Sequence, residues 1–374
     1  MKTHDVIVIG GGIIGGAVAF ELARRNLNVL VLDRQPPGQE ASWAAAGMLS
    51  PAPDSPDAIP LVSLGRASLE IYGEFTSAVE EASGEKVGFR ELGTLETLFR
   101  AEADRELSTL IALHHGLGLV AEVLRTEEAF ELEPQLSRDV GAVALLRREG
   151  CVDNRALTRG IFRALEASDV EVRAGCAVER VLISANRCLG VAAAGERIEA
   201  GSVIIAAGSF AASIEGVARY APTHPVRGQM VALRTDQFEI SHVLRSERGY
   251  IVPREGGWCV AGSTLENAGF EKKITPQGIG KILAAAVEII PALANSAILE
   301  TWSGLRPDTP DHLPSIGPTD VEGLLIATGH FRNGILLAPI TARLIADWLT
   351  SRRTSVSWDA FSPMRFAHTA HASS

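Results

Sequence analysis

The stretch Val6-Ile7-Val8-Ile9-Gly10-Gly11-Gly12-Ile13-Ile14-Gly15 decides the fold. Its first four residues form a short apolar run, which is typical of a strand buried on both faces of a parallel sheet. Gly10, Gly12 and Gly15 then fill the pattern G-x-G-x-x-G, and helix-forming residues follow over 17–25. In this pattern the first glycine permits a tight turn, the second lets the backbone approach a pyrophosphate, and the third lets the helix pack against the strand. We therefore predict a strand-to-helix turn whose helix N-terminus binds phosphate.

Residues 28–32, Asn-Val-Leu-Val-Leu, predict a second strand, which ends at Asp33. A carboxylate at this spacing is expected to accept hydrogen bonds from an adenosine ribose. Strand, glycines, helix, strand and acid in this order complete a dinucleotide-binding βαβ unit. The pattern does not separate NAD from FAD, because both present the same ADP half to the turn.

Composition narrows the class of protein further. The chain has 374 residues, enough for two domains, with 46% hydrophobic residues and a net charge of −10, which argues against a nucleic-acid partner. The apolar stretch 6–20 is too short to span a bilayer and is rich in glycine, so we expect no membrane span and a cytoplasmic location. The four cysteines are far apart and form no C-x-x-C pair, which predicts reduced, mostly buried thiols and no metal site: Cys151, Cys176, Cys188 and Cys259.

A run of small residues over 41–51, Ala-Ser-Trp-Ala-Ala-Ala-Gly-Met-Leu-Ser-Pro, would let backbone approach a flat ring system. This block resembles the S-x-x-A-A-G-M segment of the glycine oxidase branch of the D-amino-acid oxidase family of FAD enzymes. Four further blocks resemble the same family: P-V-R-G-Q at 225–229, G-Y-I-V-P at 249–253, G-L-R-P at 304–307 and G-H-F-R-N-G-I at 329–335. The similarity spans nearly the whole chain and is weakest over 52–139.

The resemblance implies an α/β fold, α+β overall, in which an antiparallel-sheet substrate domain is inserted into an FAD-binding Rossmann domain of the glutathione-reductase type. The FAD-binding domain is expected over 1–80, 145–220 and 300–366, the substrate-binding domain over 81–144 and 221–299, and a tail over 367–374. Independently, the runs 202–208 and 324–329 read as buried strands ending in glycine. Short strand-like runs at 229–233, 250–253 and 258–262 favour an antiparallel sheet, and 337–349 has the apolar spacing of a last helix.

The resemblance also implies which residues contact FAD. The expected contacts are Gly10, Gly12, Ile13, Ile14, Gly15, Asp33, Arg34, Ala41, Ser42, Ala46, Gly47, Met48, Val178, His330, Phe331, Arg332, Asn333, Gly334, Ile335 and Leu336. Some relatives carry a threonine at the position of Ala41, and a glutamate is more usual at that of Asp33. Some sarcosine oxidases attach FAD through a C-terminal cysteine; because no cysteine follows Cys259, we expect noncovalent FAD.

For the substrate, the resemblance implies that Arg306 binds a carboxylate, since a guanidinium fork matches it with two charge-assisted hydrogen bonds. Tyr250 would add a hydroxyl donor, and Arg332 and Met48 would complete the pocket, with Leu265 limiting substrate size. No residue is assigned as catalytic with certainty, because hydride transfer from a neutral amine to flavin N5 needs no strong base. The amides of 330–336 are expected to stabilise charge on the flavin, with His330 as a packing or hydrogen-bonding residue. His114 and His115 are interpreted as exposed surface.

The function implied is oxidation of glycine or small amines such as sarcosine and small D-amino acids to the imine and then the 2-oxo acid. Oxygen would be reduced to hydrogen peroxide, and in this family the imine also feeds thiazole synthesis for thiamine. Relatives assemble as homo-oligomers, often tetramers. The alternatives are a D-amino-acid dehydrogenase passing electrons to a quinone, a dinucleotide-binding regulatory module without turnover, and an NAD-dependent dehydrogenase.

Overall fold

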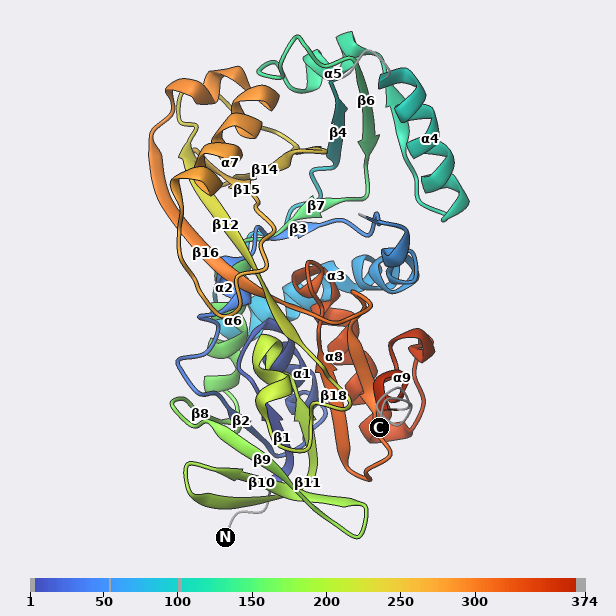
Figure 1. Cartoon of the computed structure of the whole chain (residues 1–374), viewed down its shortest axis with the longest axis vertical. Coiled ribbons are helices and arrows are strands. Elements are labelled where there is room, and N and C mark those ends of the chain that lie inside the picture. Colours follow the sequence, from blue (N-terminus) through green and yellow to red (C-terminus); the bar gives the residue numbers. More distant parts are fainter. Residues whose placement is uncertain (1–3, 54, 100–102, 368–374) are drawn as a thin grey trace.

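The computed structural model describes residues 4–53, 55–99 and 103–367, which form two large sheets with helices around them (Figure 1). The first sheet has the strand order β17-β18-β11-β1-β2-β8. Its bounds are β1 His4–Ile9, β2 Val29–Leu32, β8 Glu171–Arg173, β11 Glu196–Ile205, β17 Ser315–Pro318 and β18 Leu324–Thr328. The neighbours from β8 to β18 pair in parallel, which confirms the predicted central strands.

Helices cover one face of the parallel sheet, and a second core cluster that includes Ile7, Ile9, Leu30 and Leu32 covers the other. The helices are α1 Ile13–Ala23, α3 Leu61–Ser83, α6 Asn154–Glu166 and α8 Gly334–Ser351. They share one core cluster with the strand residues Val6, Val8, Val29 and Val31. α8 corresponds to the helix expected over 337–349 and begins three residues earlier; it is followed by the short helix α9 (Met364–Ala367). An antiparallel pair, β9 Val178–Ser184 and β10 Arg187–Ala193, extends β11 at one end.

The second sheet has the order β16-β12-β15-β14-β13-β4-β6-β5. Its bounds are β4 Thr94–Leu98, β5 Glu122–Leu124, β6 Ala142–Leu146, β12 His224–Arg234, β13 Val243–Ser246, β14 Gly249–Arg254, β15 Trp258–Gly262 and β16 Ile298–Asp308. Its pairs are antiparallel except β13 with β4, so the predicted antiparallel sheet is confirmed. α7 (Pro276–Ile289) packs against this sheet.

Figure 1 shows the long strands β12 and β16 reaching from the second sheet down to the first. They pair from His224 with Asp308 to Leu233 with Ile298, so β16 crosses the domain boundary expected at residue 300. The predicted domain limits stay predictions. The remaining elements are α2 Ala41–Ala44, β3 Met48–Leu49, η1 Pro56–Ala58, α4 Ala103–Gly116, α5 Thr126–Leu132, β7 Gly150–Cys151, η2 Gly208–Ser213, η3 Pro291–Asn295, η4 Asp359–Phe361 and α9 Met364–Ala367.

Two expectations about buried groups have different outcomes. The four cysteines are free and three are buried, with Cys176 half-buried, as predicted. His114 was expected on the surface and is buried, 4% exposed, because α4 turns this position towards the sheet; only His115 is exposed.

Of the helices in the described ranges, none is long and apolar enough to cross a membrane. The expected tail beyond Ala367 lies outside the described residues.

Candidate active site

The glycine turn closes as the sequence predicts. Gly10 has φ of 107°, and a Cβ there would lie 2.4 Å from the carbonyl oxygen of Ala206. A Cβ on Gly15 would lie 1.9 Å from the carbonyl oxygen of Gly10. Both positions therefore exclude any side chain, and the strand, the turn and α1 approach each other as closely as a nucleotide cradle requires.

The N-terminus of α1 is completed by a residue far from it in the sequence. The N-cap Gly12 offers no side chain, and the amide of Ile13 donates instead to Ser42 Oγ at 2.8 Å. The short helix α2 places Ser42 there. Because the first amides of a helix have no intrahelical acceptor, this hydroxyl and a bound phosphate can share them. The resemblance implies FAD contacts for both residues but does not indicate this bond.

Asp33 lies beside the same turn. Its Oδ2 accepts from the amide of Gly11 at 2.6 Å and its Oδ1 from the amide of Gln35 at 2.9 Å. Burial raises the pKa of the Asp33 carboxyl, and the two amide hydrogen bonds oppose that shift. Next to it, the guanidinium of Arg34 stacks on the ring of Phe210, 3.3 Å from its centroid.

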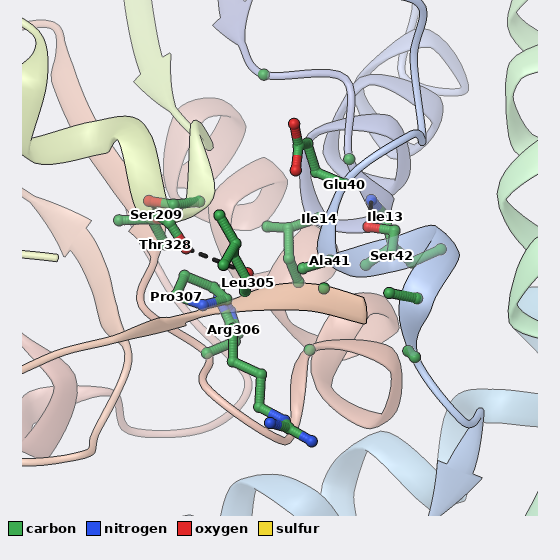
Figure 2. Close-up of a pocket in the computed structure, with 18 of the residues that line it drawn as sticks. Ile13, Ile14, Glu40, Ala41, Ser42, Ser209, Leu305, Arg306, Pro307 and Thr328 are labelled. Atoms are coloured by element: carbon green, nitrogen blue, oxygen red, sulfur yellow. Dashed lines mark hydrogen bonds between the residues drawn. The ribbon is translucent and has the colours of Figure 1, made fainter. Parts of the chain in front are cut away.

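One cavity of about 2010 Å³, counted with its open mouth, joins this cradle to the second sheet. Figure 2 shows Ile13, Ile14 and Ser42 on one side of β16, with the Arg306 side chain extending from the other. The expected site residues that line the cavity are Gly10, Gly12, Ile13, Ile14, Asp33, Arg34, Ala41, Ser42, Ala46, Gly47, Met48, Val178, Tyr250, Arg306, His330, Phe331, Arg332, Asn333, Gly334 and Ile335. Gly15 and Leu336 pack behind the wall, and Leu265 is 62% exposed outside the cavity lining, so its expected place in the pocket is wrong.

The small-residue segment 41–48 is held by side chains that no sequence pattern had indicated. Asn154 Nδ2 donates to the carbonyl of Ser42 at 2.7 Å. Trp302 Nε1 donates to that of Ala44 at 3.0 Å. The buried Arg254 donates from Nη2 to that of Ala46 at 2.5 Å. These bonds fix the backbone between Trp43 and Met48, the two large side chains of the segment, which pack in the core beside the cavity.

Arg306 is positioned from three sides. Its Nη2 donates to Ser263 Oγ at 2.7 Å and its Nη1 to the carbonyl of Thr264 at 3.1 Å. On the facing strand, a Cβ at Gly228 would lie 2.2 Å from Nη1, so glycine makes room for the guanidinium. Tyr250 lies on β14 at the same cavity, with its hydroxyl 3.7 Å from the sulfur of Met230.

The N-terminus of α8 forms another wall. Its N-cap Asn333 makes no side-chain cap, so the first amides and the positive end of the helix dipole face the cavity that Gly334 and Ile335 line. His330 is 2% exposed and its Nε2 lies 3.1 Å from Thr341 Oγ1. Burial lowers the pKa of His330 to about 3, so the imidazole is neutral at physiological pH.

The residues present fit FAD. The amides at the start of α1 and Ser42 would hold the pyrophosphate, Asp33 the ribose, and segment 41–48 and the start of α8 the flavin ring. The observation that supports this is the side-chain-free turn at Gly10, which lets the backbone approach a pyrophosphate. Among the described residues, no group of three or more His, Cys, Asp or Glu could hold a metal ion.

A nucleotide cradle that opens onto a pocket with a fixed guanidinium defines a dinucleotide-dependent oxidoreductase. In such an enzyme the cofactor accepts electrons from a substrate, and the substrate must be held against it. The chain belongs to the family of FAD dependent oxidoreductases (DAO), which matches residues 5–348. The FAD cofactor, the enzyme class and the resemblance stated from the sequence are thereby confirmed.

Individual relatives agree with this family. The chain is 30% identical over 372 residues to the glycine oxidase of Geobacillus kaustophilus, covering 97% of both chains. The crystal structure of a glycine oxidase from that organism matches with a TM-score of 0.92 and 28% identity, covering 98% of this chain and 99% of the other. A bifunctional protein ThiO/ThiG of Synechocystis sp. is 36% identical over 98% of this chain. The chain spans about half the length, 55%, of that bifunctional relative.

Proposed function

We propose that the protein oxidises glycine or a small amine, such as sarcosine or a small D-amino acid, to the imine. Water then hydrolyses the imine to the 2-oxo acid, and oxygen is reduced to hydrogen peroxide. The observation that carries this proposal is the placement of Arg306 and Tyr250 in the same cavity as the nucleotide cradle. When bound, FAD supplies the two-electron acceptor for the reaction.

The residues of the chain select and orient the substrate. The Arg306 guanidinium binds the substrate carboxylate, and the Tyr250 hydroxyl donates to it from β14, which β12 and β15 separate from β16 in the sheet. Each charge-assisted hydrogen bond of this kind contributes about 1.5–3 kcal/mol. Because Ser263 and Thr264 already hold the guanidinium, little side-chain freedom is lost when the substrate binds.

The surroundings supply the electrostatics. The amides at the start of α8 present partial positive charge to the cavity, which favours negative charge on the group beside them. His330 stays neutral in its buried place and holds the loop to Thr341 instead of moving protons. Arg332 is exposed where it lines the cavity and adds its charge to those of Arg34, Arg245 and Arg306, which line the same cavity.

An oxygen-electrode assay tests the proposal with glycine, sarcosine, D-alanine and L-alanine, and with an artificial electron acceptor in parallel. Oxygen uptake with glycine or sarcosine supports the oxidase. Turnover only with the artificial acceptor favours the dehydrogenase alternative instead. A protein that no amine reduces contradicts both.

The remaining expectations are part of the same proposal. FAD is bound noncovalently, so acid precipitation should leave the flavin in the supernatant. The protein forms a homo-oligomer, tetrameric by its resemblance to the family, which light scattering can measure. Relatives named ThiO/ThiG support a role for the imine in thiazole synthesis for thiamine.

A further inference from the structure

A group of charged side chains lies against the cavity on the side of the second sheet. Arg245 on β13 and Glu96 on β4 are paired in register, and Arg245 Nε donates to Glu96 Oε2. Arg245 Nη1 also donates to Ser50 Oγ at 2.7 Å. Arg245 and Ser50 both line the cavity that Arg306 lines. Neither takes part in the proposed binding of FAD or of the substrate carboxylate.

Glu149 lies directly behind Ser50. It is 4% exposed, and Ser50 Oγ donates to its Oε1 at 2.7 Å. Arg245 Nη1 lies 3.9 Å from its Oε2. A buried carboxylate is costly unless it is paired, yet this arginine already serves Glu96. Two carboxylates therefore share one guanidinium at the wall of the cavity.

The hydrogen bonds of Ser50 decide what it can bind. A hydroxyl has one donor and two acceptor positions. Ser50 uses its proton towards Glu149 and one acceptor position towards Arg245. Its second acceptor position is left for a donor in the cavity. Arg306 offers only hydrogen-bond donors, whereas Ser50 offers an acceptor. The cavity therefore suits a ligand with an acceptor group for Arg306 and a donor group for Ser50, and a zwitterionic amino acid has both.

We propose that Ser50 accepts a hydrogen bond from the substrate amino group and that Glu149 accepts, through Ser50, the proton that the substrate ammonium loses before oxidation. This inference rests on the proposed function. The N–H bond of the ammonium breaks as an O–H bond forms on Ser50, and the former Ser50 proton moves to Glu149 Oε1. The amine keeps the electron pair, so no oxidant takes part in this step, and Glu149 becomes a neutral acid.

The electrostatics suit this exchange. The charged and titratable groups facing Glu149 are Arg245 and Glu96, with His114 on α4 close to that pair. Burial lowers the pKa of His114, so this imidazole is neutral. Burial raises the pKa of Glu149 while Arg245 opposes that rise, which brings its proton affinity closer to the working pH. Because the charges of Arg245 and Glu96 cancel, the group of three keeps the negative charge of Glu149, and this charge attracts an ammonium.

Binding of a matched ligand pair tests the amine contact without turnover. 2-Aminoisobutyrate has no hydrogen on Cα, so it binds without being oxidised, and isobutyrate lacks only the amine. With the holoenzyme, Kd is followed by the change in flavin absorbance. Ser50→Ala should reduce the preference for the amine ligand by about tenfold or more, because a hydrogen bond to a charged group is lost. Glu149→Gln should reduce it in the same direction, because the negative charge that attracts the ammonium is removed. Isobutyrate should bind as in the wild type.

The pH dependence of single-turnover reduction by the preferred amine tests the proton transfer. In Glu149→Gln the rate should fall at neutral pH and be regained at alkaline pH, where the free amine is abundant. Glu122→Gln, which removes an exposed carboxylate paired with Arg147, is the matched control and should change neither measurement. If amines reduce the wild type but both variants keep its ligand preference and its pH profile, this inference is overturned and the proposed function stands. If no amine reduces the wild type, the proposed function fails and takes this inference with it.

Discussion

The hydroxyl of Tyr72 donates a hydrogen bond to the carbonyl oxygen of Ile335 at 3.0 Å, across 263 residues of sequence. In α8 this carbonyl would normally accept from the amide of residue 339, but Pro339 has no N–H. Tyr72, which is fully buried on α3, takes the place of the missing donor. The first turn of the helix that lines the cavity is therefore completed by a side chain of a different helix.

Tyr72→Phe should lower the free energy of unfolding by about 1–3 kcal/mol, because it leaves a buried carbonyl without a donor. In a Pro339→Ala background the loss should be smaller, since residue 339 then supplies the amide. Urea unfolding of the four holoproteins measures the cycle. Losses that agree within about 0.5 kcal/mol in the two backgrounds would show that the two sites do not compensate each other.

Gly228→Ala should displace the Arg306 guanidinium, because the new methyl group would lie 2.2 Å from Nη1. We expect kcat/KM to fall by about tenfold or more, as when a charge-assisted hydrogen bond is lost, while FAD content stays unchanged. Gly280→Ala on α7 is the control, since a Cβ there meets nothing within 4 Å. Equal kcat/KM for Gly228→Ala and wild type would mean that Arg306 has room to move and does not need this glycine.

The sequence reveals features that depend on local backbone geometry, but it does not reveal contacts between residues that are far apart along the chain. The glycine turn was predictable because Gly10 and Gly15 are required by local backbone geometry. Bonds such as those from Tyr72 to Ile335 and from Ser50 to Glu149 join residues 263 and 99 positions apart, and no local pattern encodes them.

The expected exposure of His114 was wrong because it depends on where the residue lies around the helix axis. The stretch around His114 is polar, so the sequence predicts a solvated helix. The two adjacent histidines, however, lie about 100° apart around the helix axis. One of them is therefore turned inward while His115 stays exposed.

Ser42→Ala should weaken FAD binding. The substitution removes the acceptor of the Ile13 amide and a hydroxyl at the phosphate end of the cavity. A loss of about 1 kcal/mol corresponds to roughly a fivefold rise in Kd for FAD. Recovery of flavin fluorescence on dilution measures it, and Ser63→Ala, at an exposed serine on α3, is the control. A Kd equal to that of the wild type would show that the serine only caps the helix.

His330 gives the unfolding free energy a defined pH dependence. Burial lowers its pKa from 6.5 to about 3, so the folded protein keeps the imidazole neutral while the unfolded chain takes up a proton below about 6.5. The stability is therefore fully present above pH 6.5 and is lost as the pH falls towards 3. His330→Gln should remove this slope, which approaches at most about 1.4 kcal/mol per pH unit for one group. Urea unfolding of wild type, His330→Gln and the exposed control His115→Gln at pH 7, 6 and 5 checks it. Parallel stability curves for His330→Gln and wild type would mean that the imidazole accepts a proton in the folded state despite its burial.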